Sequence, residues 1–151
     1  MLLIRKATQK DLLLIQKLNN QLFELELATF DKYLIKDWPL TKQGREYFEN
    51  SINEDYVIVA ELNHKVVGYL LGECADKSYY PFKIAELCNM CIDKDYRKQG
   101  IGNFLFHQFE NDFKAKGINH FIVTASFKNE NAIAFYKKMG FESTNITLAK
   151  F

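Results

Sequence analysis

Apolar residues recur at helical spacing in four parts of the chain. The first part opens with Thr8 and Asp11, spaced as in a capping box, and its apolar residues predict an amphipathic helix that ends near Leu27. Three further helices are predicted over Lys42–Ile52, Gly100–Lys116 and Asn131–Lys138. The last two are followed by Gly117 and Gly140, which suit the ends of helices.

Between these helices, β-branched and aromatic residues gather in runs that predict strands. The expected strands are Leu2–Arg5, Tyr56–Glu61, Lys65–Ala75, Ile84–Ile92, Phe121–Ala125, and one or two more within Glu142–Phe151. Asn63-His64 turns the chain, so the strands on either side of it form a hairpin. A run of strands, a crossover helix and then a strand, helix and strand indicate a mixed sheet flanked by helices. We therefore predict a mixed α/β (α+β) fold.

The composition favours one globular domain. A chain of 151 residues can bury most of its surface around one core, and no linker or repeat divides it, so we predict a single domain over residues 1–151. Its 20 basic and 19 acidic residues give a net charge of +1, without the broad basic field that drives sequence-independent binding to nucleic acid. No apolar run approaches the roughly 18 to 20 residues that span a bilayer. We expect a cytoplasmic protein with no membrane or nucleic-acid partner.

The three cysteines, Cys74, Cys88 and Cys91, cannot all pair within one chain. Cys88 and Cys91 have the C-x-x-C spacing, but they lie in a strand-like run, where positions three apart point to opposite faces. No second pair completes a zinc site. Buried, reduced thiols are the simpler interpretation, so we expect no metal.

The segment Arg97–Asn103 combines the features of a phosphate-binding loop. It reads Arg-Lys-Gln-Gly-Ile-Gly-Asn and lies between the apolar strand that ends at Ile92 and an amphipathic helix. Gly100 and Gly102 let the backbone approach a ligand closely, N–H groups at the helix start favour an anion, and the arginine and lysine add positive charge. Nucleoside-triphosphate and dinucleotide loops would need further residues that are missing here. The pattern favours a pyrophosphate site, and a plain glycine-rich helix start is the alternative.

Arg97, Gly100 and Gly102 resemble the phosphate-loop signature R/Q-x-x-G-x-G/A of the GCN5-related N-acetyltransferase (GNAT) family. A second family signature is similar to a later part of the chain, at Asn129, Ala132, Phe135, Tyr136, Gly140 and Phe141. The spacing between the two signatures also agrees, and the resemblance extends over the whole chain. It implies the GNAT fold, with a central, mixed, mostly antiparallel twisted sheet of about six to seven strands and about four flanking helices.

The resemblance implies an acyltransferase that moves an acetyl group from acetyl-CoA to a primary amine by direct attack in a ternary complex. In the family the pantetheine arm lies along a splayed central strand, whose N–H groups stabilise the oxyanion. The cofactor-binding residues implied are Met90, Cys91, Ile92, Arg97, Lys98, Gln99, Gly100, Ile101, Gly102, Asn103, Asn129 and Tyr136. For Asn129, capping of the following helix is an alternative or additional role.

Tyr136 is the expected proton donor to the departing thiolate, because a phenol remains neutral at pH 7. On periodicity alone it would be a core aromatic residue. The base is open: one branch of the family, acting on ribosomal-protein N-termini, carries a glutamate where this chain has Thr124. Glu86, at the start of the central strand, is the substitute by resemblance to other branches. Alternatively, Glu86 is only an exposed carboxylate at the end of a strand. A water relay would then deprotonate the amine.

The acceptor side implied by the resemblance offers carboxylates and aromatic rings, which suit a cationic amine. These residues are Glu24, Glu26, Asp31, Asp37, Trp38, Glu73, Asp76, Tyr79 and Tyr80. We expect a small-molecule primary amine or a protein amine. A non-catalytic acyl-CoA sensor or scaffold is one rival. A toxin-like enzyme acting on aminoacyl-tRNA is another, and it would need a basic groove.

Apolar residues in the terminal segment, Ile146, Leu148 and Phe151, are candidates for a homodimer contact. They fit a core strand equally well. Because self-association is common in the family, we favour a dimer.

Overall fold

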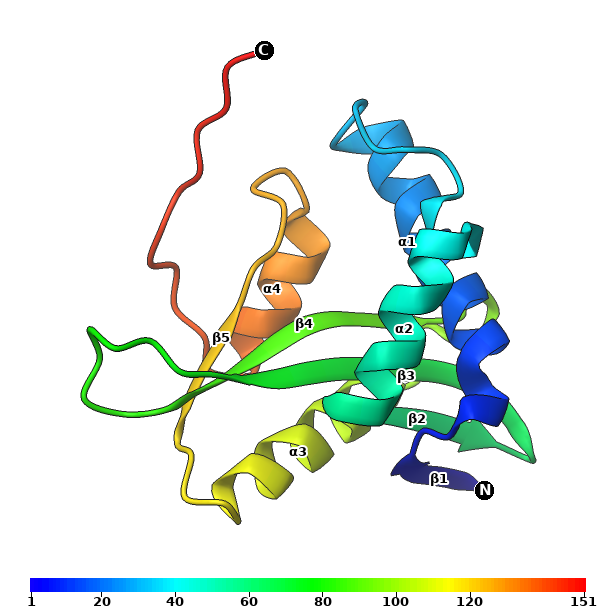
Figure 1. The fold of residues 1–151 in the computed structure, drawn as a ribbon, viewed down its shortest axis with the longest axis horizontal. Helices are drawn as coiled ribbons and strands as arrows, with labels where there is room; N and C mark the ends of the chain where they lie inside the picture. The colour runs from blue at the N-terminus through cyan, green and yellow to red at the C-terminus, as the bar shows by residue number, and fades with distance from the viewer.

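A twisted sheet lies at the centre of the molecule, with helices on both of its faces (Figure 1). The computed structural model describes residues 1–151. The strands follow chain order across the sheet and are β1 (Leu2–Lys6), β2 (Tyr56–Leu62), β3 (Lys65–Ala75), β4 (Ile84–Ile92) and β5 (His120–Val123). The first four are antiparallel neighbours, and β5 is parallel to β4. The predicted mixed, mostly antiparallel sheet is confirmed, but it has 5 strands, fewer than expected.

Four helices cover the sheet. α1 (Leu12–Thr29) and α2 (Lys42–Glu54) pack on one face, and α3 (Ile101–Lys114) and α4 (Glu130–Lys138) lie on the other. Short 3-10 turns connect the elements at η1 (Gln9–Asp11), η2 (Trp38–Leu40) and η3 (Lys94–Tyr96). All four helices predicted from periodicity are present, which confirms that part of the prediction.

Each helical layer packs on its own apolar cluster. On one face, Phe109 of α3 is fully buried against the sheet. A Cβ atom at Gly72 would lie 2.5 Å from Cε2 of Phe109, so the glycine lets α3 lie close to β3. On the other face, Ile15 of α1 and Phe48 of α2 pack in a cluster with Tyr69. The sheet is therefore buried on both sides around its centre.

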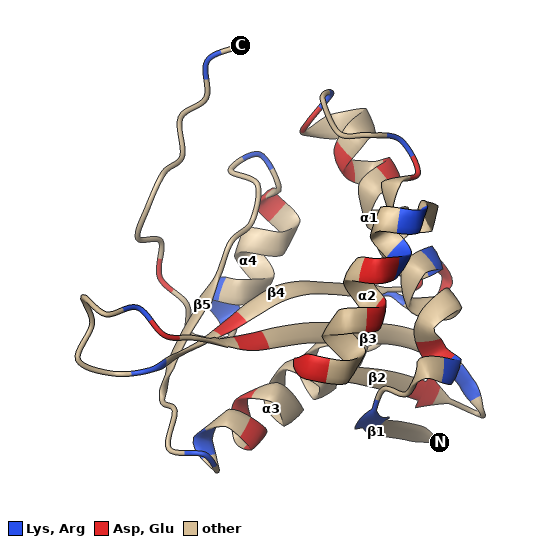
Figure 2. Cartoon of the chain, in the orientation of Figure 1, with Lys and Arg blue, Asp and Glu red and all other residues tan.

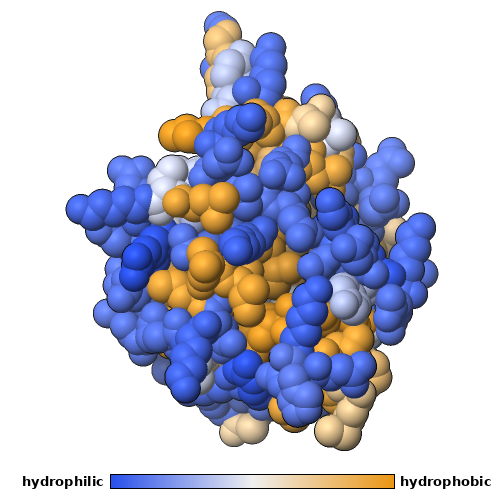
Figure 3. All heavy atoms as spheres, turned by 90° about the vertical axis from the view of Figure 1, so that its right-hand side faces the viewer, coloured by the Kyte–Doolittle hydropathy of each residue, from blue (hydrophilic) through white to orange (hydrophobic).

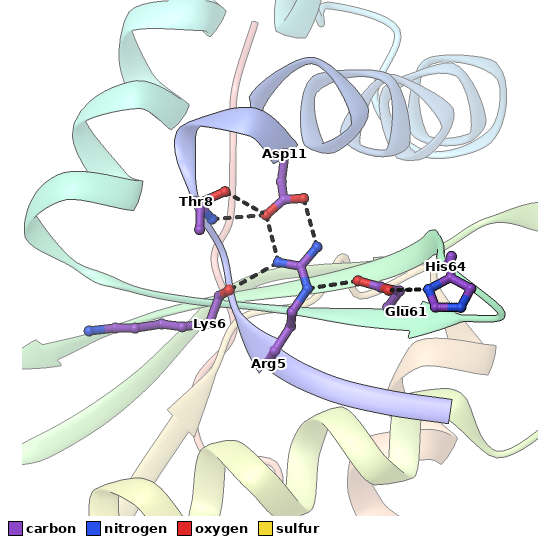
Figure 4. Close-up of polar contacts among 6 residues, drawn as sticks. All are labelled: Arg5, Lys6, Thr8, Asp11, Glu61 and His64. Carbon is purple, nitrogen blue, oxygen red and sulfur yellow. Dashed lines mark hydrogen bonds and ion pairs between the residues drawn. The ribbon is translucent and has the colours of Figure 1, made fainter. Parts of the chain in front are cut away.

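Arg5 joins β1 to the start of α1 and to β2 (Figure 4). Its guanidinium donates to both carboxylate oxygens of Asp11, at 2.9 and 3.0 Å, and its Nε donates to Glu61 at 2.7 Å. Asp11 also accepts a 2.8 Å hydrogen bond from the backbone N–H of Thr8, so the predicted capping box is present. Burial raises the pKa of Asp11, but the hydrogen bonds from Arg5 and Thr8, together with the charge of Arg5, outweigh it and lower the pKa below its usual value.

β4 and β5 separate halfway along β4. Their pairing covers only Ile84–Leu87 and His120–Val123, whereas β4 continues to Ile92. Cys88 has no register partner in β3 and forms a β-bulge, which bends β4 at the point where β5 leaves it. The outer edge of β4 beyond Leu87 therefore has no strand beside it.

The terminal segment Glu142–Phe151 contains no strand, so the prediction of one or two strands there is wrong. None of its residues takes part in a backbone hydrogen bond, and in Figure 1 it extends past α4 as a coil. Alternation of apolar residues is insufficient for a strand without a neighbouring edge. Ile146 and Leu148 consequently stay exposed, and Phe151 stacks on Tyr33 with ring centroids 4.4 Å apart. β5 remains the edge of the sheet.

The surface mixes charges and carries some apolar side chains. Acidic and basic residues are interspersed over the elements (Figure 2). On the side where α1 lies, apolar side chains gather in the middle of the surface within a polar surround (Figure 3). Leu13 and Leu14 of α1 are among the exposed large apolar residues. No helix combines the length and apolarity that crossing a bilayer requires.

Candidate active site

A cavity of about 340 Å³ lies between the two helical layers, where β4 and β5 separate. α1, η2 and α2 line one side of it, β4 forms its floor, and the segment after β5 and α4 line the other side. Its polar lining residues are Asn19, Glu26, Tyr47, Cys88, Asn89, Thr124, Ser126, Asn129 and Tyr136. The volume is in the range of small-molecule sites.

The segment Arg97–Asn103 lies between η3 and α3 and presents free backbone donors. Gly100 caps α3 in the left-handed region at φ 80°, where an L side chain would be strained. Lys98 also has a left-handed backbone, at φ 62°. The N–H groups from Gly100 to Asn103 donate no hydrogen bond within the chain. Four unpaired donors at a helix N-terminus, with two cationic side chains in the loop, are suited to a phosphate group.

Gly102 connects this loop to the cavity. A Cβ atom at Gly102 would lie 3.4 Å from Cζ of Phe135 and 3.8 Å from Cε of Met90. Met90 lines the cavity, and Phe135 packs edge-on against Tyr136, which also lines it. The free backbone N–H groups and the cavity are thus adjacent.

The sequence model of the acetyltransferase (GNAT) domain matches residues 53–143, more than half of the chain. The chain belongs to the GNAT family. It is therefore an acetyltransferase, as the sequence comparison of its two signatures predicted. No curated protein is a significant match.

Solved structures share this GNAT fold along the full chain. The BH1408 protein from Bacillus halodurans, solved as a mutant, has a TM-score of 0.88 at 21% identity, with 98% of each chain covered. A putative acetyl transferase from Pyrococcus furiosus has a TM-score of 0.81 at 20% identity, with 99% of each chain covered. The aminoglycoside acetyltransferase meta-AAC0020 from an uncultured soil metagenomic sample, solved with sisomicin, has a TM-score of 0.73 at 24% identity, covering 99% of this chain and 95% of that one. At these identities the likeness shows the fold alone.

Tyr136 of this GNAT domain points its ring into the boundary between core and cavity. It packs edge-on against Phe135 and Phe141, at centroid distances of 5.3 and 5.8 Å. Its hydroxyl has no hydrogen-bond partner in the chain. Burial raises the pKa of Tyr136 to about 12, so the phenol keeps its proton at neutral pH.

The other predicted cofactor residues divide into three groups. Met90 and Asn129 line the cavity with Tyr136, whereas Cys91 is buried in the core beside α1 and Ile92 packs, partly buried, against the cluster beneath α3. The residues of the loop lie next to the cavity through Gly102. Asn129 caps α4, since its Oδ1 accepts a 3.1 Å hydrogen bond from the N–H of Ala132. The capping role proposed for Asn129 is therefore present.

Glu86, the predicted base, lies on β4 directly opposite Glu73 of β3 and is not among the residues that line the cavity. Burial, and then the charge of Glu86, raise the pKa of Glu73. Thr124 does line the cavity. The carboxylate in the lining is Glu26 of α1, which was one of nine acceptor-side candidates in the sequence.

Sequence reasoning missed a buried hydrogen-bond chain beneath the cavity. Asn19 Nδ2 donates to the hydroxyl of Tyr69 at 2.8 Å, and that hydroxyl donates to Oδ1 of Asn89. Tyr69 is completely buried, and its pKa is raised well above the ordinary value by burial. Both asparagines line the cavity. The available signal was a polar residue at an apolar position, in α1 for Asn19 and in β4 for Asn89.

The three cysteines are free, but the expectation of buried thiols holds for Cys91 alone, since Cys74 is exposed and Cys88 is partly exposed. Burial, followed by the nearby carboxylates, raises the pKa of Cys88 to about 12, and burial raises the pKa of Cys91 to about 11. Both stay thiols at neutral pH. No cluster of His, Cys, Asp or Glu side chains in the chain is arranged to hold a metal ion.

Proposed function

We propose that the protein transfers the acetyl group of acetyl-CoA to the nitrogen of a primary amine by direct attack in a ternary complex. The observation that carries this proposal is the junction at Gly102. There, four unpaired helix N–H groups meet a cavity that contains a protonated phenol, that of Tyr136. An anion site adjoining a proton donor fits a substrate with a phosphate at one end and a thioester at the other.

The chain offers contacts for each part of acetyl-CoA. The N–H groups of Gly100–Asn103 would hold the pyrophosphate, with Arg97 and Lys98 adding charge. Arg97 Nε already donates to the carbonyl of Ile92 at 3.0 Å, which ties the loop to the end of β4. The free edge of β4 from Met90 to Ile92 would pair with the pantetheine amides as a strand does. When bound, acetyl-CoA supplies an activated acetyl thioester.

The protein residues then accept a proton from the amine, donate one to the sulfur and stabilise the negative charge that develops on the carbonyl oxygen. The amine must be neutral to attack, because an ammonium has no lone pair. As the nitrogen bonds to the carbonyl carbon, N–H groups of β4 stabilise the charge on oxygen. Tyr136 gives its phenolic proton to the sulfur as the C–S bond breaks, and solvent restores it. Glu86 is the proposed base for the proton that leaves the nitrogen, and a water molecule would carry the proton to it. The alternative is a water relay to solvent with no single protein base.

Calorimetric titration with acetyl-CoA tests the binding half of the proposal. Gly102→Glu places bulk and negative charge among the free N–H groups, so we expect it to abolish measurable binding. Asn111→Glu is the control, because it adds the same charge to an exposed position further along α3. Loss of binding in both variants, or in neither, contradicts the assignment of the loop.

Release of free CoA across a panel of amines tests the transfer half. Wild-type protein that binds acetyl-CoA and acetylates amines supports the proposal. Binding without CoA release on any amine would mean that the protein is an acyl-CoA sensor. Activity confined to aminoacyl-tRNA would mean that its acceptor is a nucleic acid.

We also propose a homodimer, formed through the terminal segment Glu142–Phe151. Ile146 and Leu148 are exposed there, and the outer edge of β5 has no strand partner in the same chain. A second copy's segment would satisfy both. Light scattering should give a dimer for the full chain and a monomer after removal of residues 142–151. A dimer that survives this deletion, but not Leu14→Glu on α1, would place the contact on the α1 surface instead.

A further inference from the structure

The wall of the cavity formed by α1, η2 and α2 is aromatic. Phe23 of α1 stacks on Trp38 of η2 with ring centroids 5.7 Å apart. Trp38 meets Tyr47 of α2 edge-on at 5.9 Å, and Tyr47 meets Phe48 at 5.0 Å. These four rings, all in the cavity lining, form a continuous row. Aromatic faces attract cations through their π electrons.

The same wall contains an unpaired carboxylate. Glu26 is the one charged residue among the 18 that line the cavity, and no lysine, arginine or histidine is present there to balance it. Its carboxylate is half-buried and takes part in no hydrogen bond or ion pair within the chain. Burial, and then the charge of Asp31, raise its pKa. Figure 2 shows acidic residues at this end of α1, and both basic and acidic residues in the loop that follows it.

A partly desolvated carboxylate without a partner costs stability, and packing gives no reason for it. A cation bound in the cavity would supply both the missing counter-charge and a group for the aromatic row. The amine that attacks the thioester cannot be this cation, because it must lose its charge first. The cation at Glu26 therefore belongs to a second group of the acceptor.

We propose that Glu26 and the rings of Phe23, Trp38 and Tyr47 bind a second amino group of the acceptor, which stays protonated while the first is acetylated. The acceptor is then a small molecule with at least two amino groups. One lies at Glu26 on α1, and the other lies beside Met90 and Tyr136, where it is acetylated. A cavity of about 340 Å³ encloses both ends of such a molecule. This inference rests on the proposed acetyl transfer to an amine.

Matched amines test the inference. Diaminobutane and pentylamine have nearly the same length, and they differ in whether the distal end carries an ammonium or a methyl group. With wild-type protein, kcat/KM from CoA release should be about 10-fold to 100-fold higher for diaminobutane, as for a charge-assisted contact in a partly buried site. Glu26→Gln should bring the ratio of the two kcat/KM values close to one.

Glu46→Gln is the matched control, because Glu46 is exposed on α2, next to Tyr47 in the sequence, and lies outside the cavity lining. It should keep the wild-type ratio. Trp38→Leu is a second variant, and it should lower the ratio through loss of the aromatic face. Equal kcat/KM values for the two amines in the wild type would overturn the inference, as would an unchanged ratio in Glu26→Gln.

Calorimetry with acetyl-CoA separates the two levels of failure. If the wild type fails to bind acetyl-CoA, the proposed function itself is wrong. If it binds acetyl-CoA and acetylates pentylamine as well as diaminobutane, acetyl transfer stands and the second cationic site is wrong.

Discussion

The hydroxyl of Tyr69 lies between two asparagines, accepting a hydrogen bond from Asn19 and donating one to Asn89. This fixes the side-chain amide of Asn89, because its oxygen is committed to Tyr69 and its nitrogen must point elsewhere. α1, β3 and β4 are thereby joined beneath the cavity. A single buried hydroxyl thus connects the α1 wall of the cavity to its floor.

Tyr69→Phe should destabilise the protein by about 1–3 kcal/mol, because the ring is kept but the buried amide of Asn19 and the partly buried amide of Asn89 each lose a partner. Urea unfolding would measure the loss. Tyr79→Phe is the control. Tyr79 is 75% exposed, so loss of its hydroxyl should leave the free energy of unfolding almost unchanged. A loss at Tyr69 no larger than at Tyr79 would show that the chain of hydrogen bonds adds no stability.

Tyr136→Phe should behave in the opposite way. Its hydroxyl bonds to no group of the chain, so the free energy of unfolding should change little, whereas kcat should fall by about 100-fold through loss of the proton donor. Steady-state kinetics on the same samples used for urea unfolding would show both effects. An unchanged kcat with a good acceptor amine would remove Tyr136 from the mechanism.

The pH profile gives an independent check on Tyr136. A donor is active while protonated, and its pKa is raised to about 12, so its contribution is present below that value and lost only above it. The rate should therefore rise with pH as the acceptor amine becomes neutral, with no decline up to about pH 10. A decline of kcat in the wild type, absent from Tyr136→Phe, would mean that the phenol titrates earlier.

The parts of the site that the sequence predicted are those encoded locally. The loop Arg97–Asn103 can be recognised from the sequence because its glycines, its cations and the following helix are consecutive. Gly100 does adopt the left-handed conformation that such a loop needs. The four helices and all five strands follow from the patterns of apolar, β-branched and aromatic residues. Tyr136 depended on the resemblance, because its spacing alone fits a core residue.

The parts that the sequence did not predict depend on distant partners. Tyr69 lies 50 residues from Asn19 and 20 from Asn89, and no local pattern brings them together. The terminal segment alternates as a strand does, but pairing is decided by whether a neighbouring edge is available. The cavity lining combines α1, α2, β4 and α4, so its single carboxylate could not be chosen from the nine acceptor-side candidates.

Gly44 controls the position of Trp38. A Cβ atom at Gly44 would lie 2.4 Å from the carbonyl oxygen of Trp38, so Gly44→Ala should push η2 away from α2. Helix propensity favours alanine by about 1 kcal/mol, but the clash with backbone should outweigh it. Trp38 is the single tryptophan of the chain, so its fluorescence reports the change directly.

We expect Gly44→Ala to shift the emission of Trp38 to longer wavelength and to increase its quenching by acrylamide. KM for the acceptor amine should rise, while the affinity for acetyl-CoA should change little. Gln43→Ala, at an exposed position of the same helix turn, is the control. Wild-type fluorescence in Gly44→Ala would show that α2 and η2 can accommodate a methyl group.

The contact between Arg5 and Asp11 predicts how stability depends on pH. Because Arg5 depresses the pKa of Asp11 in the folded state, the contact contributes fully above the ordinary aspartate pKa, near 4, and is lost as the pH falls through the lower, folded value. Asp11→Asn should therefore cost about 1–3 kcal/mol at pH 7, discounted for the partial exposure of Arg5. Below about pH 4 the difference from wild type should shrink. Urea unfolding across this pH range measures the difference in free energy of unfolding. Asp76→Asn, at an exposed position, is the control. A difference that stays constant with pH would mean that the cost arises from packing rather than from the carboxylate charge.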